Sequence, residues 1–91
     1  MSDVVGVLAE RQKTHGDFTH HARITQMLKF VVDNELADKP GHLSPAQKET
    51  IDMIFHKIGR IIAGNPNVED HWLDISGYSE LARLRCQPVR T

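Results

Sequence analysis

Two pairs of acidic residues, each about one helical turn apart, are the side chains of this sequence best suited to chemistry. Glu49 and Asp52 form one pair, and Asp70 and Asp74 form the other. Carboxylate oxygens suit Mg²⁺ and Mn²⁺, and a metal held by them can bind a polyphosphate and activate a water molecule. Two antiparallel helices that bring the pairs together would make a metal site for phosphoanhydride hydrolysis.

Three basic side chains lie between the acidic pairs along the chain. Lys57 and Arg60 are candidate phosphate contacts, and His56 is a candidate proton acceptor or orienting group. A simpler interpretation uses the same residues: Asp74 pairs with Lys57 or Arg60, and Asp70 interacts with the dipole at the start of its helix. The sequence leaves both interpretations open.

The elements that must position these residues are four helices. Ser44 and Pro45 are typical of an N-cap followed by a first helical residue, Asp17 is a second N-cap candidate, and Gly64 ends a helix. Because no period-two strand pattern occurs, the fold class is all-α, a small antiparallel bundle of about four helices. The predicted helices cover residues 3–13, 17–36, 45–63 and 68–86.

Two helical faces are expected to pack inward. The third helix places five apolar residues on one arc: Ile51, Ile54, Phe55, Ile58 and Ile62. On the last helix, Asp70 and Asp74 share a face with Leu73, Gly77, Tyr78, Leu81 and Leu84. Burial of an ionised carboxylate requires a cation, a metal or hydrogen-bond donors, so both aspartates need a partner. Gly59 and Gly77 are expected to let these two helices approach closely.

Composition narrows the function classes. With 91 residues, 40% of them hydrophobic, the chain is expected to form one helical domain over residues 1–91 and to build any large site as a homo-oligomer. The net charge of −1 disfavours nucleic acid as a partner, and the basic cluster Arg83, Arg85 and Arg90 is interpreted as a solubilising tail.

Other features favour a protein of the cytoplasm that does not enter membranes. The single cysteine, Cys86, cannot form an internal disulfide, and neither a secretory signal nor an apolar run of about 20 residues occurs. The histidines near residue 20 match no zinc motif. Residues 14–18 are predicted to form a structured turn whose polar side chains border a ligand pocket.

Several motifs together resemble a family of small bacteriophage and prophage proteins. They are Arg11 with the residues of 14–18 (Thr-His-Gly-Asp-Phe), Leu-Ser-Pro at 43–45, Lys-Ile-Gly-Arg at 57–60, and Asp-His-Trp-Leu-Asp-Ile-Ser-Gly-Tyr at 70–78. The resemblance covers nearly the whole chain. It implies a phage origin and action in the host cytoplasm, without implying an activity.

A looser resemblance is to the MazG-like all-α nucleoside triphosphate pyrophosphohydrolases. Their paired acidic motifs lie on neighbouring helices, and Glu49-x-x-Asp52 is similar to the first of them. The second differs, since Asp70 and Asp74 are four residues apart. This likeness implies Mg²⁺ or Mn²⁺ as cofactor, with Glu49, Asp52, Asp70 and Asp74 as ligands, and sites built from more than one subunit.

Two hypotheses of function follow. The first is a metal-dependent nucleotide-processing protein in which His56, Lys57 and Arg60 serve the reaction. The alternative is a non-catalytic phage accessory or anti-defence protein that binds a host protein or a nucleotide signal through a helical surface.

Overall fold

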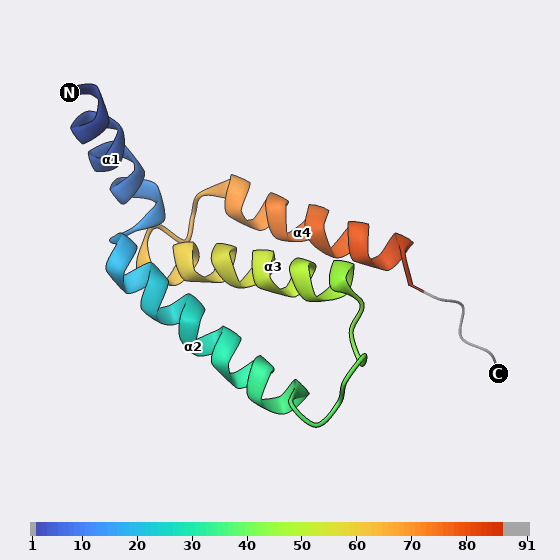
Figure 1. Cartoon of the computed structure of the whole chain (residues 1–91). Coiled ribbons are helices and arrows are strands. Elements are labelled where there is room, and N and C mark those ends of the chain that lie inside the picture. Colours follow the sequence, from blue (N-terminus) through green and yellow to red (C-terminus); the bar gives the residue numbers. More distant parts are fainter. Residues whose placement is uncertain (1, 87–91) are drawn as a thin grey trace.

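Four helices form the molecule, as the sequence predicts. The computed structural model describes residues 2–86, and the side-chain surroundings of residues 4–86 (Figure 1). The helices are α1 (Ser2–His15), α2 (Phe18–Leu36), α3 (Pro45–Ala63) and α4 (Glu69–Leu84). The fold class is therefore all-α, with consecutive helices of the bundle running antiparallel. The first helix extends two residues beyond the predicted end, and the last stops two residues before it.

Side-chain caps set two of the helix starts. Ser44 Oγ accepts a hydrogen bond of 3.1 Å from Gln47 N, and Gln47 Oε1 accepts one of 2.9 Å from Ser44 N. This reciprocal pair satisfies two of the amide groups that a helix start leaves free. Asp17 caps α2 by accepting a hydrogen bond of 3.2 Å from His20 N. Both predicted N-caps are confirmed.

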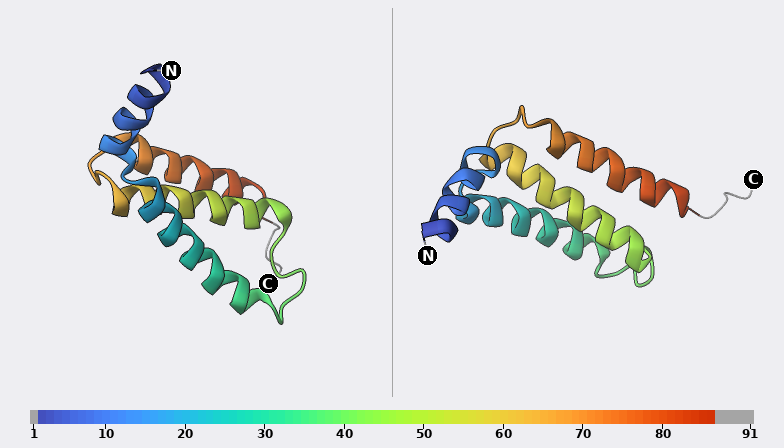
Figure 2. Two further views of the ribbon diagram at one scale, coloured as in Figure 1. Left: turned by 60° about the vertical axis from the view of Figure 1, so that its left-hand side comes forward. Right: turned by 90° about the horizontal axis from the view of Figure 1, so that it is seen from above.

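Three of the helices form a single layer. Helices α2 and α4 both pack against α3, which lies between them, and they do not contact each other (Figures 1 and 2). Helix α1 meets α2 and α3 near its C-terminal end and leans away from the layer. Within the described residues, no helix has the length and apolar character needed to cross a membrane.

The contact between α2 and α3 is close because α3 carries a glycine there. A Cβ atom at Gly59 would overlap the His21 ring and lie 2.7 Å from Thr25 Oγ1. Further along the same contact, Lys29 Nζ lies 3.3 Å from His56 Nε2, and both side chains are partly buried. Gly59 thus serves a close helix approach, but its partner is α2 and not α4 as the sequence predicted.

The packing face of α4 also differs from the prediction. Leu73, Leu81 and Leu84 are 62%, 49% and 63% exposed, and a Cβ at Gly77 would have no neighbour within 4 Å. The physical reason is that His71, which is buried, lies 3.2 Å from the carbonyl oxygen of Thr14 through its Nε2. This polar contact brings His71 to the packing side together with Asp74 and Tyr78, which are partly buried as the prediction requires, whereas the leucines of the predicted line are exposed.

Few apolar side chains are fully buried in this layer. Among the residues with described surroundings, Ile61 is the one buried hydrophobic residue, and His21, Thr25, Lys57 and His71 are the buried polar ones. The apolar arc predicted to face inward on α3 is only half-buried, and Ile62 within it is exposed. In a single layer, neighbouring helices touch only along the line where they meet. A hydrophobic core forms only when a second layer covers one face of the first.

Two glycine substitutions are expected to have opposite effects on stability. Gly59→Ala should lower the free energy of unfolding by about 1–3 kcal/mol, because its methyl group overlaps the buried His21 ring. Gly77→Ala should raise it by about 0.5–1 kcal/mol, because alanine favours a helix and space is open there. Urea unfolding followed by circular dichroism measures both, and equal effects at the two sites would contradict the assigned packing.

Candidate functional site

The carboxylate of Asp74 forms an ion pair with a lysine. Lys57 Nζ lies 2.7 Å from Asp74 Oδ2, and the Lys57 side chain is 10% exposed. The hydrogen bond from Lys57, aided by the charges of Lys57, His71 and Arg60, lowers the pKa of Asp74. The sequence left Asp74 either as a metal ligand or as the partner of a basic residue, and the structure contains the ion pair.

The other three predicted metal ligands lie apart. Asp52 is held by Lys48, whose Nζ is 2.9 Å from Asp52 Oδ1 and 3.2 Å from Asp33 Oδ1. Glu49 is exposed and lines a groove toward the C-terminal end of α4, whereas Asp70 is exposed in the first turn of that helix. In the described part of the chain, no three His, Cys, Asp or Glu side chains are placed to hold a metal ion. One chain alone does not assemble the predicted Mg²⁺ or Mn²⁺ site.

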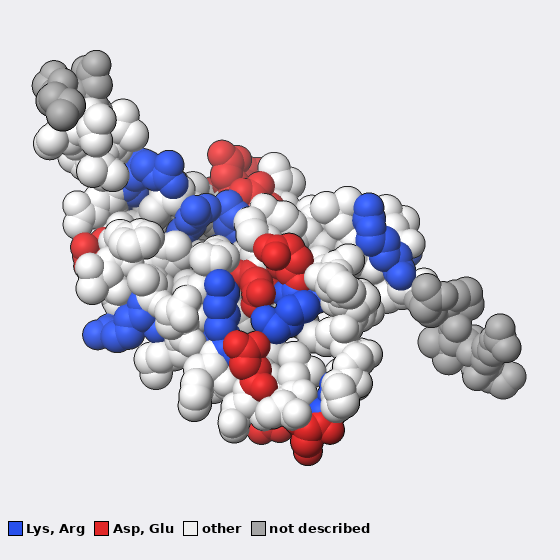
Figure 3. Space-filling model, in the orientation of Figure 1, with Lys and Arg blue, Asp and Glu red and all other residues white. Residues whose placement is uncertain are grey.

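The three predicted catalytic residues point in different directions from α3. Lys57 reaches α4 through Asp74, and His56 lies beside Lys29 of α2. Figure 3 shows acidic and basic side chains gathered over the middle of the molecule on one face. Arg60, on a third side of α3, lines a cleft.

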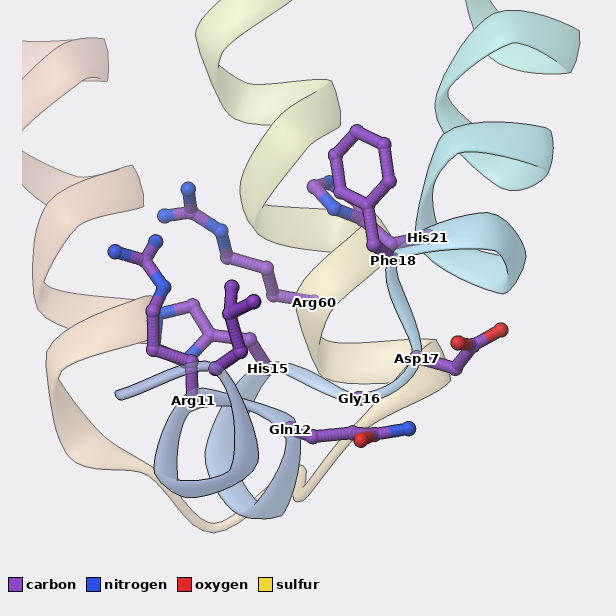
Figure 4. Close-up of a pocket in the computed structure, with 9 residues that line it drawn as sticks. Arg11, Gln12, His15, Gly16, Asp17, Phe18, His21 and Arg60 are labelled. Carbon is purple, nitrogen blue, oxygen red and sulfur yellow. The ribbon is translucent and has the colours of Figure 1, made fainter. Parts of the chain in front are cut away.

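The cleft lies where α1 gives way to α2, beside the C-terminal half of α3 (Figure 4). Its volume is about 320 Å³, within the range of about 300–1,000 Å³ typical of small-molecule sites. The lining residues are Leu8, Arg11, Gln12, His15, Gly16, Asp17, Phe18, His21 and Arg60. Four of these nine lining residues belong to the predicted turn at residues 14–18.

Two backbone turns meet behind the cleft and hold it in place. Gly16 has a φ of 79°, a left-handed conformation that glycine adopts readily. A Cβ at Gly16 would overlap the Ala63 carbonyl, and one at Gly64 would lie 2.6 Å from Gly16 N. A hydrogen bond of 3.3 Å from Asn65 N to Thr14 O joins the same turns. The end of α1 is therefore fixed against the end of α3 by backbone contact.

Two arginines, Arg11 and Arg60, line the cleft. Figure 4 shows the Arg11 and Arg60 side chains near the His15 ring, whereas the Asp17 carboxylate is directed away from both arginines. Neither arginine forms an ion pair within the described residues. Burial and the nearby charge of Arg11 lower the pKa of Arg60, against a smaller raising effect of Asp74 and Tyr78. A guanidinium that is half-buried beside another one favours an anionic partner.

His15 and His21, which line the cleft, favour the neutral form at pH 7. Burial lowers the pKa of His15, with further lowering by Arg60, His71 and Arg11. Burial and the charges of Arg60 and His56 lower the pKa of His21 in the same way. The rings of His15 and His71 meet edge to face at 4.9 Å. Each histidine can therefore donate or accept a hydrogen bond without adding charge.

Comparison with known proteins places the chain in a family. The family described as a domain of unknown function, DUF6378, matches residues 4–85. This protein belongs to the DUF6378 family. No curated protein and no solved structure matches the chain.

The family match covers the whole cleft of this DUF6378 protein, from Leu8 to Arg60. Sequence reasoning had selected Arg60 as a phosphate contact and the turn at residues 14–18 as a pocket border. It had assigned no chemistry to Arg11, although Arg11 belongs to the motif set that carries the phage resemblance. The cluster Arg83, Arg85 and Arg90 was interpreted as a solubilising tail. Arg83 forms an ion pair with Glu80 of the same helix, and Arg90 lies outside the described residues.

The Lys57–Asp74 pair of this DUF6378 protein predicts a specific pH dependence. The pKa of Asp74 is lower in the folded chain than its ordinary value of 3.8, so the pair stabilises the fold above that value. The stabilisation is lost as the pH falls through the lowered folded pKa. Asp74→Asn should therefore lower the free energy of unfolding at neutral pH and have little effect below the folded pKa. Urea unfolding across this range tests it, with Asp38→Asn, in an exposed loop, as control.

Proposed function

We propose that this protein binds a nucleotide, holding its phosphate groups in the cleft between α1, α2 and α3. The observation that carries the proposal is the convergence of Arg11 and Arg60 on one cleft in which no carboxylate pairs with them. Arginine forks match phosphate oxygens with paired hydrogen bonds, and a phosphate would supply the missing negative charge. His15 adds a polar ring between the two arginines (Figure 4).

An aromatic side chain at the rim favours a nucleotide over a simple phosphate. Phe18 lines the cleft and is 77% exposed, and its ring meets the His21 ring edge to face at 6.1 Å. Stacking of a base on an aromatic ring contributes about 1–3 kcal/mol. An exposed phenylalanine beside two arginines can therefore receive the base while the arginines hold the phosphates.

The distribution of acids favours binding over metal-dependent hydrolysis by a single chain. Asp52 and Asp74 form ion pairs with Lys48 and Lys57, and in the described part of the chain no three acidic or histidine side chains are placed to hold a metal ion. Hydrolysis would need these carboxylates to leave their lysines or to be joined by acids of another chain. Of the two hypotheses drawn from the sequence, the accessory protein that binds a nucleotide agrees better with this arrangement.

Calorimetric titration with ATP and with inorganic triphosphate tests the proposal. Arg60→Gln should weaken binding of both at least about tenfold, because a charge-assisted hydrogen bond contributes about 1.5–3 kcal/mol. Phe18→Ala should weaken ATP binding and leave triphosphate binding unchanged. Arg23→Gln, an exposed arginine of α2 outside the cleft, is the matched control. Equal binding by wild type and Arg60→Gln would refute the proposed site.

A turnover assay separates binding from catalysis. Incubation of ATP or another nucleoside triphosphate with Mg²⁺ or Mn²⁺ should leave the nucleotide intact if the protein only binds it. Pyrophosphate release that Asp74→Asn abolishes, with the variant still folded, would instead restore the hydrolase hypothesis.

Protonation of His15 should strengthen binding of the anion. Its pKa is lowered in the free protein, so the ring is neutral near pH 7 and gains charge as the pH falls. Triphosphate affinity should therefore rise more in the wild type than in His15→Gln as the pH falls below the ordinary histidine value of 6.5. The same slope in both proteins would show that His15 does not contact the anion.

A further inference from the structure

Helix α1 is held to the molecule near its C-terminal end. Residues 4–13 are all exposed, and partial burial begins at residues 14–16. Thr14 reaches α4 through its carbonyl oxygen, which accepts a hydrogen bond of 3.2 Å from His71 Nε2. His15 is the partly buried residue of this end whose side chain packs on another helix, because its ring meets the His71 ring.

The His15 ring lies among basic groups from three helices. Arg11 is one turn earlier on α1, and Arg60 comes from α3. The buried His71 of α4 meets the His15 ring edge to face at 4.9 Å. Figure 4 shows the ring beside both arginines. A charge on His15 would therefore be added to charges of the same sign.

The groups of α2 and the nearest ion pair do not compensate for this. His21 of α2 is a further base that lines the cleft. The carboxylate of Asp17 accepts a hydrogen bond from a backbone amide of α2 and is directed away from the arginines. Asp74 is paired with Lys57. Within the described residues, His15 forms no ion pair.

The hydrogen bonds of His15 assign one proton to its neutral ring. Thr14 Oγ1 donates its single proton to the Arg11 carbonyl at 3.2 Å. It therefore accepts from His15 Nδ1, 2.5 Å away, and Nε2 is the atom that a second proton would occupy. Burial and the charges of Arg60, His71 and Arg11 lower the pKa of His15, against a smaller raising effect of the Arg11 carbonyl.

We propose that protonation of His15 releases the end of α1 from α3 and α4 and leaves the layer of α2, α3 and α4 intact. In the released state the ring is in water, where the ordinary histidine pKa of 6.5 applies, above that of the packed ring. Release therefore takes up a proton. The packed state is fully favoured above pH 6.5 and loses stability as the pH falls from there to the lowered pKa.

The contact of α2 with α3 is more extensive than the contact of α1. It runs from His21 to Asp33, which is about three helical turns. His21 and His56 lie within it, and burial lowers the pKa of both, so acid weakens this contact as well. It also includes the ion pair of Asp33 with Lys48, whereas in the described residues no ion pair joins α1 to another helix. We therefore expect α1 to be released first.

An anion in the cleft opposes this release, since it supplies negative charge beside a protonated His15. The proposal does not need the anion, and its test is made without nucleotide or phosphate. Its failure would leave the proposed nucleotide site untouched.

Hydrogen–deuterium exchange of the full chain, followed by mass spectrometry of its peptides, tests the proposal. Protection factors, which correct for the intrinsic effect of pH on exchange, are compared at about pH 7.5 and about pH 5.5. Protection of residues 4–15 should fall at least about threefold, and protection of α3 should fall less. His15→Gln should abolish the fall in α1. The matched control is His42→Gln, which replaces an exposed histidine of the loop before α3.

Each outcome of the experiment decides the matter. A fall in protection that is larger in α1 than in α3, retained in His42→Gln and absent in His15→Gln, supports the proposal. Constant protection of α1, an equal fall in α1 and α3, or a fall as large in His15→Gln as in the wild type overturns it. Where His15→Gln does not fold, Arg60→Gln decides: a smaller fall supports the proposal because one repelling charge is gone, and an unchanged fall overturns it.

Discussion

The contact between the two glycine turns is the constraint on which the rest of the structure depends. Gly16 and Gly64 bring the backbone between α1 and α2 against the backbone between α3 and α4, with no room for a Cβ atom. The carbonyl of Thr14 then lies where Asn65 N and His71 Nε2 both reach it. One backbone oxygen thereby sets the position of α1, the rotation of α4 and the wall of the cleft.

Charge is distributed unevenly around this junction. Toward α4 and along α2, carboxylates and lysines satisfy one another in the pairs Lys57–Asp74 and Lys48–Asp52. Beside the junction, Arg11 and Arg60 have no such partner among the described residues. The molecule thus separates a neutral, paired region from a region with surplus positive charge. Within the described residues, the arginines of the cleft form no ion pair, whereas Asp52 and Asp74 each do.

Local sequence signals predicted the helices well because caps act within one turn. Ser44 with Gln47, and Asp17 with His20, are contacts between residues three apart, which a sequence displays directly. The inward face of α4 was predicted correctly for Asp74 and Tyr78 and wrongly for the leucines, because a helical wheel records apolar periodicity and cannot show a distant polar contact. His71 meets Thr14 across 57 positions of the chain. The cleft could be predicted only in part, since Arg11 and Arg60 come to line it through the contact of the turns at Gly16 and Gly64, which lie far apart in the sequence.

Thr14 and His71 are in contact although they lie far apart in the sequence, and this affects how the molecule folds. The α2–α3 and α3–α4 contacts join neighbours in the sequence, so they can form early, whereas the end of α1 must close a much longer loop. We therefore expect closure of α1 to be a late step of folding, and its opening to be a partial unfolding of low free energy. Opening of α1 alone would remove Arg11 and His15 from the cleft while α2, α3 and α4 stay packed.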